Sequence, residues 1–212
     1  MRSALLAGGT GLIGGQLLRL LLDSTTYDRV VAITRKRLPE HPKLAQLTIE
    51  FDQIAAHADA MKADDVFCCL GTTIAKAGSK EKFYDVDFRF PLAVADATHK
   101  MGATKYLLVS SLGANSKSPV FYNRVKGEIE EAVLHVGFET VHIFRPSLLL
   151  GERGEKRSAE DAAKLFYRIF GFVIPKKYMA IDSGKVASAM LHFASQNKSG
   201  NFIHESAELQ DY

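Results

Sequence analysis

The sequence contains few of the residues and patterns that fix a function by themselves. Only two of its 212 residues are cysteines. Cys68 and Cys69 are adjacent on a predicted strand, so a disulfide framework is excluded and buried thiols are expected. The seven histidines show no His-Glu-x-x-His spacing and no Cys-x-x-Cys pair occurs, so we expect no metal site.

Long apolar runs and a strong charge imbalance are also absent. No run is long enough to cross a bilayer, and the chain opens on a strand-like segment rather than a cleavable leader, so we expect a cytoplasmic protein that does not bind a membrane. The 27 basic and 24 acidic residues give a net charge of +3, too small to indicate nucleic acid as a partner. With 47% hydrophobic residues, the chain is expected to form one domain over residues 1–212.

Glycines near the amino terminus form the most informative pattern. The run Ser3–Ala7 leads into Gly8-x-x-Gly11-x-x-Gly14 and a leucine-rich segment, which predicts a strand, a tight turn and a helix. Such glycines allow a sharp turn, a close approach to a pyrophosphate and close packing of helix on strand. We therefore predict that a dinucleotide contacts Gly8, Thr10, Gly11, Leu12, Ile13 and Gly14. The alternatives are an ordinary glycine-rich turn and a triphosphate-binding loop, and the latter lacks its lysine.

Apolar and helix-forming segments alternate along the rest of the chain. Further strands are predicted at Arg29–Arg35, Leu47–Phe51, Asp65–Leu70, Lys105–Val109, Thr140–Pro146 and Asn201–Glu205. Helices are predicted at Gln16–Leu22, at Ser79–Met101 with a kink at Pro91, from Phe121 onward and at Ser183–Ser195. This alternation indicates an α/β fold with a doubly wound parallel sheet and helices on both faces.

The end of the second predicted strand bears on the choice of cofactor. In NAD-binding members of this fold, a carboxylate at this place binds the ribose 2′-hydroxyl. Here Thr34 is followed by Arg35, Lys36 and Arg37, and a guanidinium suits a 2′-phosphate. We therefore favour NADP(H) over NAD(H), with Arg35 as the main contact and Lys36 or Arg37 in support. The alternative is that these charges only solvate a loop.

Two later strand ends offer further cofactor contacts. Asp52 follows the third predicted strand, where it could lie near the adenine ring or cap a helix that starts at Gln53. Leu70, Gly71 and Thr72 follow the fourth, where small residues leave room for the ribose and nicotinamide but also suit an ordinary turn. Both segments belong to the carboxyl edge of the predicted sheet.

A serine, a tyrosine and a lysine are expected to meet at the same edge. Ser110 or Ser111 ends the fifth predicted strand, and Tyr122 and Lys126 lie four residues apart on one helix face. A phenol can donate a proton to a carbonyl oxygen while hydride reaches the carbon, and an ammonium group stabilises the resulting phenolate. A serine hydroxyl can orient the carbonyl. The alternative is a packed aromatic ring and a solvated lysine.

These motifs together resemble the short-chain dehydrogenase/reductases of the atypical class, and in particular the small NAD(P)-binding oxidoreductases of the Tat-interacting-protein type. The matching segments are Gly8–Gly14, Cys68–Thr73, Leu108–Ala114, Tyr122–Glu128 and Phe144–Ser147. The resemblance implies a Rossmann-like fold, NADP(H) along the carboxyl edge with Pro146 among its contacts, and a catalytic group of Ser111, Tyr122 and Lys126.

Two departures from sugar-modifying relatives narrow the expected activity. The interval from serine to tyrosine is short and the large carboxyl-terminal substrate domain is absent, which argues against a sugar-nucleotide epimerase. Substrate contacts are expected from residues 113–120 and 148–182. We expect an NADPH-dependent oxidoreductase acting on a small carbonyl-type substrate. The alternative is a non-catalytic NADP(H)-binding sensor with a regulatory protein partner, and the sequence leaves homo-oligomer formation open.

Overall fold

One parallel sheet organises the computed structural model, which describes residues 2–150 and 175–212, without the side chains of residues 51, 52 and 177. The sheet has seven strands in the order β3-β2-β1-β4-β5-β6-β9. The strands are β1 (Ser3–Ala7), β2 (Arg29–Thr34), β3 (Leu44–Thr48), β4 (Asp65–Cys68), β5 (Lys105–Val109), β6 (Thr140–Arg145) and β9 (Gly200–Glu205). Strands β7 (Leu149–Leu150) and β8 (Ile181–Asp182) form a separate parallel pair.

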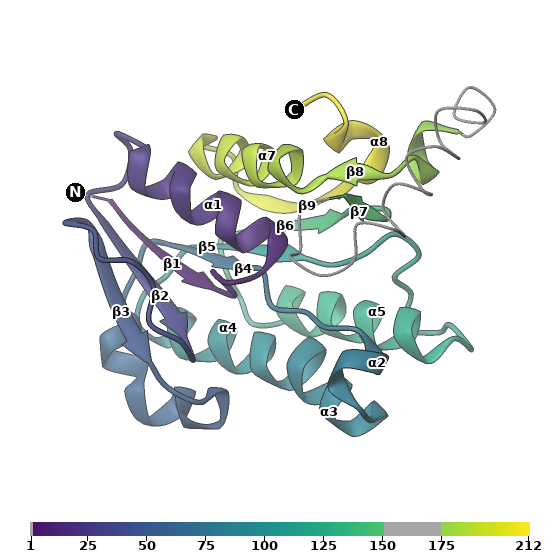
Figure 1. Ribbon diagram of the computed structural model, residues 1–212, viewed down its shortest axis with the longest axis horizontal. Coiled ribbons are helices and arrows are strands. Elements are labelled where there is room, and N and C mark those ends of the chain that lie inside the picture. The colour runs from purple at the N-terminus through teal and green to yellow at the C-terminus, as the bar shows by residue number, and fades with distance from the viewer. Residues whose placement is uncertain (1, 151–174) are drawn as a thin grey trace.

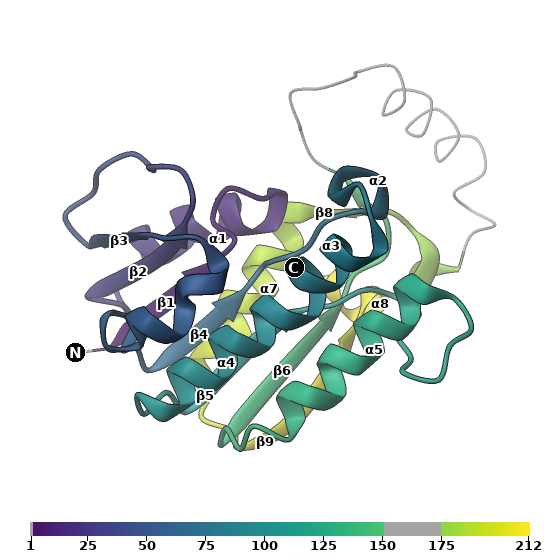
Figure 2. The same ribbon diagram turned by 90° about the horizontal axis from the view of Figure 1, so that it is seen from below.

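Helices cover both faces of the sheet, which confirms the predicted doubly wound α/β fold. Helices α1 (Leu12–Asp23) and α7 (Ser183–Ser195) lie above it in Figure 1, and α4 (Phe90–Lys100) and α5 (Phe121–Leu134) lie below. Figure 2 shows α4 and α5 crossing the lower face. The shorter elements are the 3-10 helices Phe51–Met61 and Lys176–Tyr178, the helices α2 (Ile74–Ala77), α3 (Lys80–Tyr84) and α8 (Ser206–Leu209), and the π turn Asp85–Arg89.

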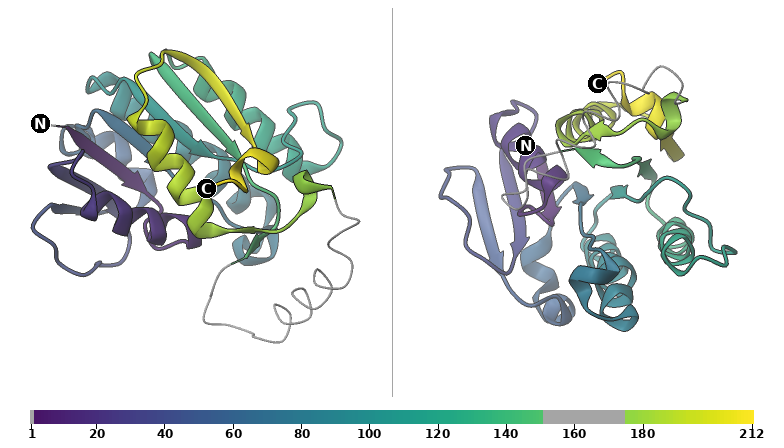
Figure 3. Two further views of the ribbon diagram at one scale, coloured as in Figure 1. Left: turned by 90° about the horizontal axis from the view of Figure 1, so that it is seen from above. Right: turned by 45° about the vertical axis from the view of Figure 1, so that its right-hand side comes forward.

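The two faces of the sheet carry two apolar cores. Leu6, Phe67 and Leu107 pack with α1 and α7, which lie side by side in Figure 3. Leu5 and Leu108 belong to the core on the α4 and α5 side. Burial on both faces explains why the central strands are almost continuously apolar. No helix within the described residues is long and apolar enough to span a membrane.

The strand order reverses between β1 and β4, and this reversal locates the site. Leu5 of β1 pairs with Val31 of β2 on one side and with Val66 of β4 on the other. The connections that follow β1 and β4 therefore leave in opposite directions along the sheet. In open α/β sheets, ligands bind in the crevice outside the carboxyl ends of the strands at this reversal.

Two predicted boundaries were wrong. The third strand is Leu44–Thr48 instead of Leu47–Phe51, because it pairs with β2 from Leu44 opposite Val30 onward. The long helix is also interrupted earlier than predicted. Pro91 lies in the first turn of α4, and the distortion precedes it as a π turn in which the Phe90 amide bonds the Asp85 carbonyl. A proline without an amide hydrogen fits at a helix start, so it did not need to kink the helix.

A buried histidine pair joins β6 to β9. Nδ1 of His142 and Nε2 of His204 share a hydrogen bond of 2.9 Å, and Nδ1 of His204 lies 3.2 Å from Glu208 on α8. Phe193 of α7 stacks on the His204 ring. Burial, reinforced by His204 and by Lys105, lowers the pKa of His142 to about 4. Burial also lowers the pKa of His204, and Glu208 opposes that shift.

We expect this histidine pair to make the protein less stable in mild acid. In the unfolded chain His142 takes up a proton below about pH 6.5, whereas the folded protein resists protonation down to about pH 4. The free energy of unfolding should therefore fall by about 2 kcal/mol between pH 7 and pH 5 from His142 alone. Urea unfolding at the two pH values measures this difference.

Two variants show whether the histidine pair is responsible. His142→Phe keeps an aromatic ring among its neighbours and should lose much of the pH dependence. His135→Asn, at the exposed end of α5, should keep all of it. Equal stability of the wild-type protein at pH 7 and pH 5 would contradict the expectation.

Candidate functional site

The turn after β1 is built from close backbone contacts. Gly8 has a φ of +91°, and its carbonyl accepts a hydrogen bond of 3.0 Å from the Gly11 amide. A Cβ on Gly8 would lie 2.6 Å from the Cys69 carbonyl oxygen, and one on Gly14 would lie 2.1 Å from the Gly8 oxygen. No side chain fits at either position. Both glycines are therefore needed for β1, α1 and the segment after β4 to meet.

The remaining residues of this turn differ in what they can offer a ligand. Gly11 and Thr10 are exposed, and a Cβ on Gly11 would be 3.3 Å from the nearest backbone atom. Leu12 is half-buried, whereas the Ile13 side chain lies in the core, so only its main chain can reach a ligand. The first amides of a helix lack partners within the helix and carry positive potential. This end of α1 is therefore suited to an anion such as a pyrophosphate.

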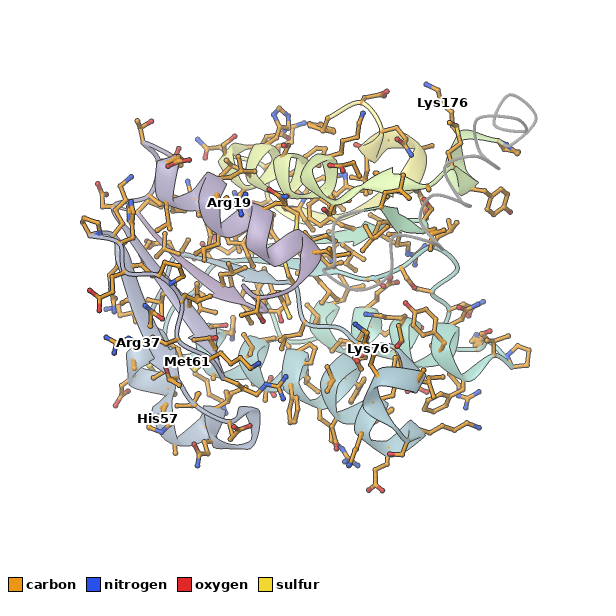
Figure 4. The ribbon with its side chains drawn as sticks, in the orientation of Figure 1. Arg19, Arg37, His57, Met61, Lys76 and Lys176 are labelled. Carbon is orange, nitrogen blue, oxygen red and sulfur yellow. The ribbon has the colours of Figure 1, made fainter. Side chains whose placement is uncertain are left out.

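The basic residues after β2 are exposed. Thr34 is buried, and its hydroxyl accepts a hydrogen bond from the Lys36 amide at 3.2 Å. Arg35 and Lys36 form no ion pair with any residue that the structure describes. Arg37, which Figure 4 labels on the β2 and β3 side of the molecule, instead pairs with Glu40 at 2.9 Å. Arg35 and Lys36 therefore remain available to a phosphate, and Arg37 is partly neutralised.

The segment after β4 lies against a buried carboxylate. Leu70 is buried and Gly71 is exposed, and the Thr72 amide donates a 2.9 Å hydrogen bond to Oδ2 of Asp87. A Cβ on Gly71 would be 3.4 Å from Oδ1 of Asp87 and 3.7 Å from Nζ of Lys126. The predicted cofactor segment and the predicted lysine are thus brought together. Helix α2 follows at once, and Figure 4 labels its Lys76.

Two serines end β5, and both have unpartnered hydroxyl groups. The Ser110 amide bonds the Phe144 carbonyl at 2.7 Å, which extends the pairing of β5 with β6. Neither the Ser110 nor the Ser111 hydroxyl has a hydrogen-bond partner among the described residues, although both oxygens are buried. Pro146 lies beside them, and its carbonyl accepts a 2.9 Å hydrogen bond from the Leu112 amide. Both serines therefore remain candidates for binding a substrate oxygen.

Tyr122 and Lys126 lie one turn apart near the start of α5. The Tyr122 ring packs on the buried Phe83 of α3, with ring centroids 5.5 Å apart. Lys126 is 5% exposed, and its Nζ lies 2.8 Å from Oδ1 of Asp87. Burial by itself lowers the pKa of Lys126, but the Asp87 carboxylate and the Tyr122 phenol outweigh it, so the pKa is raised. The lysine is therefore charged at neutral pH and lies near the tyrosine.

Sequence reasoning missed two residues that shape this site. Asp87 has no sequence signal, because an acidic residue in a helical stretch resembles a solvated charge. Gly127 does have one, since a glycine inside a helix is unfavourable without a packing reason. A Cβ there would lie 2.0 Å from the Ser116 amide nitrogen. The loop after β5 is therefore pressed directly onto α5.

Some predicted contacts fall partly outside the described residues. The main chain of Asp52 lies in the 3-10 helix, but its side chain is outside them, as are residues 151–174 of the predicted substrate segment 148–182. In segment 113–120, the Asn115 amide bonds the Asn123 carbonyl, and the Arg124 guanidinium bonds the Ser118 carbonyl. This segment is thus fixed to α5.

The residues present fit a dinucleotide. The exposed Gly11 lies at a helix start, the unpaired Arg35 at the end of β2, and the exposed Gly71 beside Lys126, along the carboxyl edge where such a ligand binds in this fold. Ser110 and Ser111 add unpartnered hydroxyls at the same edge.

Comparisons with known proteins agree with this arrangement. The chain is 34% identical to the Eremothecium gossypii protein "Protein FMP52, mitochondrial", over 98% of this chain and 95% of that protein. It is 37% identical to the Emericella nidulans protein fmp52, over 82% and 78%. Rat Protein HTATIP2 is 34% identical over 78% of this chain and 70% of its own length, which confirms the predicted resemblance to the Tat-interacting-protein type.

Solved structures confirm the fold. MoeE5 in complex with UDP-glucuronic acid and NAD has a TM-score of 0.74 at 16% identity, covering 95% of this chain and 75% of its own. A short chain dehydrogenase family protein from Francisella tularensis has a TM-score of 0.71 at 14% identity, with 98% of both chains covered. Both likenesses are to the Rossmann-like architecture.

One expectation from the sequence is wrong. A cytoplasmic location is contradicted by the fungal relatives, which are named as mitochondrial proteins. The family is established independently, since the model of the "NAD dependent epimerase/dehydratase family" matches residues 4–169. With its glycine turn, its strand order and its relatives, the chain belongs to the NAD dependent epimerase/dehydratase family.

Proposed function

We propose that the protein is an NADPH-dependent oxidoreductase that reduces a small carbonyl compound. The observation that carries this proposal is the placement of Tyr122 one turn from a buried, charged Lys126, beside the exposed Gly71 at the carboxyl edge of the sheet. The family supports a nicotinamide dinucleotide in general, and the unpaired Arg35 favours the phosphorylated form.

The residues divide the work of carbonyl reduction. NADPH supplies the hydride that reaches the carbonyl carbon. Tyr122 donates its phenolic proton to the carbonyl oxygen, so an alcohol forms and a phenolate remains. The Lys126 ammonium stabilises that phenolate, and the Ser111 hydroxyl donates a hydrogen bond to the substrate oxygen. Measuring Ser110→Ala and Ser111→Ala in parallel decides which serine acts.

NADPH should bind at least tenfold more tightly than NADH, and Arg35→Ala should remove most of that difference. Loss of a charge-assisted hydrogen bond to the 2′-phosphate corresponds to about 1.5–3 kcal/mol, or roughly a tenfold to hundredfold weaker affinity. Calorimetric titration of each nucleotide into both proteins measures this. NADH affinity should not change, because NADH has no 2′-phosphate.

Arg37→Ala is the matched control, since Arg37 lies two residues away and already pairs with Glu40. Its effect on NADPH affinity should be smaller than that of Arg35→Ala. Equal wild-type affinity for the two nucleotides would refute the NADPH preference. If neither binds, the proposed function fails as a whole. If NADPH binds but no member of a carbonyl panel is reduced, the protein is a cofactor sensor. The names of the fungal relatives support a mitochondrial location.

A further inference from the structure

Asp87 is a buried acidic residue in the middle of the candidate site, and the mechanism above gives it no task. It is 1% exposed and lies in the π turn Asp85–Arg89. Both of its oxygens point into the site: Oδ2 accepts the Thr72 amide at 2.9 Å, and Oδ1 lies 2.8 Å from Nζ of Lys126. A π turn inside helical structure occurs frequently at functional sites.

The neighbouring acidic residue shows that this placement is specific to Asp87. Asp85 lies in the same turn and pairs with Arg89 at 2.6 Å, on a partly exposed surface. Asp87 faces inward and pairs with a lysine that is itself 5% exposed. A buried ammonium is strongly disfavoured unless a carboxylate compensates it. Removing the carboxylate therefore leaves Lys126 either uncharged or displaced.

The pair also fixes a relation between two segments. Asp87 binds the main chain at Thr72 and the side chain of Lys126 at once, and Gly71 lies against both groups. The segment after β4 is where the ribose and nicotinamide are expected, and α5 carries the proposed proton donor. Asp87 is the described residue whose side chain contacts both of these segments at the site.

We propose, on the basis of the function proposed above, that Asp87 is a positioning residue that holds the Lys126 ammonium against Gly71 and Thr72 before cofactor arrives. Lys126 then meets the cofactor ribose and the Tyr122 phenol in a fixed place and with its charge in place. The carboxylate itself transfers no proton to the substrate.

The first test follows Lys126 directly in the cofactor-free protein. The protein is labelled with ¹³C at the lysine Cε carbons, and the Lys126 signal is identified by its loss in Lys126→Arg. In the wild-type protein Lys126 should titrate above the ordinary lysine value of about 10.4. In Asp87→Asn it should titrate below that value, whereas Asp85→Asn, the matched control, should leave it unchanged. This readout requires neither cofactor nor substrate.

The second test uses turnover and its pH dependence. Asp87→Asn should lower kcat by about a hundredfold, the size expected when a catalytic group is misplaced by a small distance. Its activity should also decline at a lower pH than that of the wild-type protein, as Lys126 loses its proton. Asp87→Glu restores the charge and should recover part of kcat. A residue with only a structural role would change stability without moving the pH profile.

The outcomes separate this proposal from the proposed function. If the wild-type protein shows no turnover while the Lys126 titration shifts in Asp87→Asn, the proposed function fails and the positioning of Lys126 stands. If Lys126 titrates alike in the wild-type protein and in Asp87→Asn, the positioning role is overturned, whatever the activity. If Asp87→Asn does not fold, the wild-type titration decides: a Lys126 pKa at or below the ordinary value overturns the proposal.

Discussion

Tyr122→Phe is expected to reduce kcat/KM for carbonyl reduction by about a thousandfold while NADPH affinity changes by less than about threefold. The variant keeps the ring that packs on Phe83, so the start of α5 should stay in place. It removes the hydroxyl that donates the proton, and general acid catalysis contributes roughly a hundredfold to ten-thousandfold. NADPH oxidation with a panel of carbonyl compounds gives the rates, and calorimetry gives the affinity.

Tyr84→Phe is the matched control for this variant. Tyr84 ends α3 and stacks on Phe88, outside the proposed catalytic group. Its loss of a hydroxyl should leave kcat/KM within about twofold. If Tyr122→Phe retains turnover within about tenfold of the wild-type protein, Tyr122 is not the general acid and the proton comes from another group.

Two adjacent glycines should respond in opposite directions to the same substitution. In Gly14→Ala the new Cβ would overlap the Gly8 carbonyl oxygen at 2.1 Å, so α1 must move away from β1. We expect the free energy of unfolding to fall by about 3 kcal/mol. In Gly15→Ala the nearest atom would be the Gly9 oxygen at 3.6 Å, an ordinary contact. That variant should be more stable by about 0.5–1 kcal/mol, because alanine favours a helix.

Urea unfolding of the two variants and the wild-type protein measures both effects. NADPH titration is run alongside, and Gly14→Ala should bind the nucleotide weakly because the start of α1 is displaced. A Gly14→Ala protein as stable as the wild type would mean that the close contact between helix and strand is not required.

Most of the fold could be predicted because its signals are local. The glycines after Ala7 and the β-branched run Arg29–Thr34 identify a strand and its neighbour without any knowledge of distant contacts. The third strand could not be placed correctly, since Leu44–Thr48 and the segment after it are similarly apolar. Its register is decided by pairing with β2, which appears only in three dimensions.

The candidate site divides in the same way. Tyr122 and Lys126 could be proposed from their spacing on one helix, and the two serines from their position at a strand end. The partner of Lys126 could not, because Asp87 lies on another element and gains its importance only through burial. Which serine acts also depends on side-chain direction beyond the strand, where alternation no longer decides it.

The pairing of α1 with α7 has a consequence for how the protein is made. Every residue proposed to act on cofactor or substrate precedes residue 147, so the ribosome delivers all of them before α7 is synthesised. Until α7 arrives, however, the apolar surface shared by α1 and the upper face of the sheet has no cover. The nascent chain therefore carries its complete chemistry on an unfinished core, and we expect a chaperone to shield that surface until the last helix closes it.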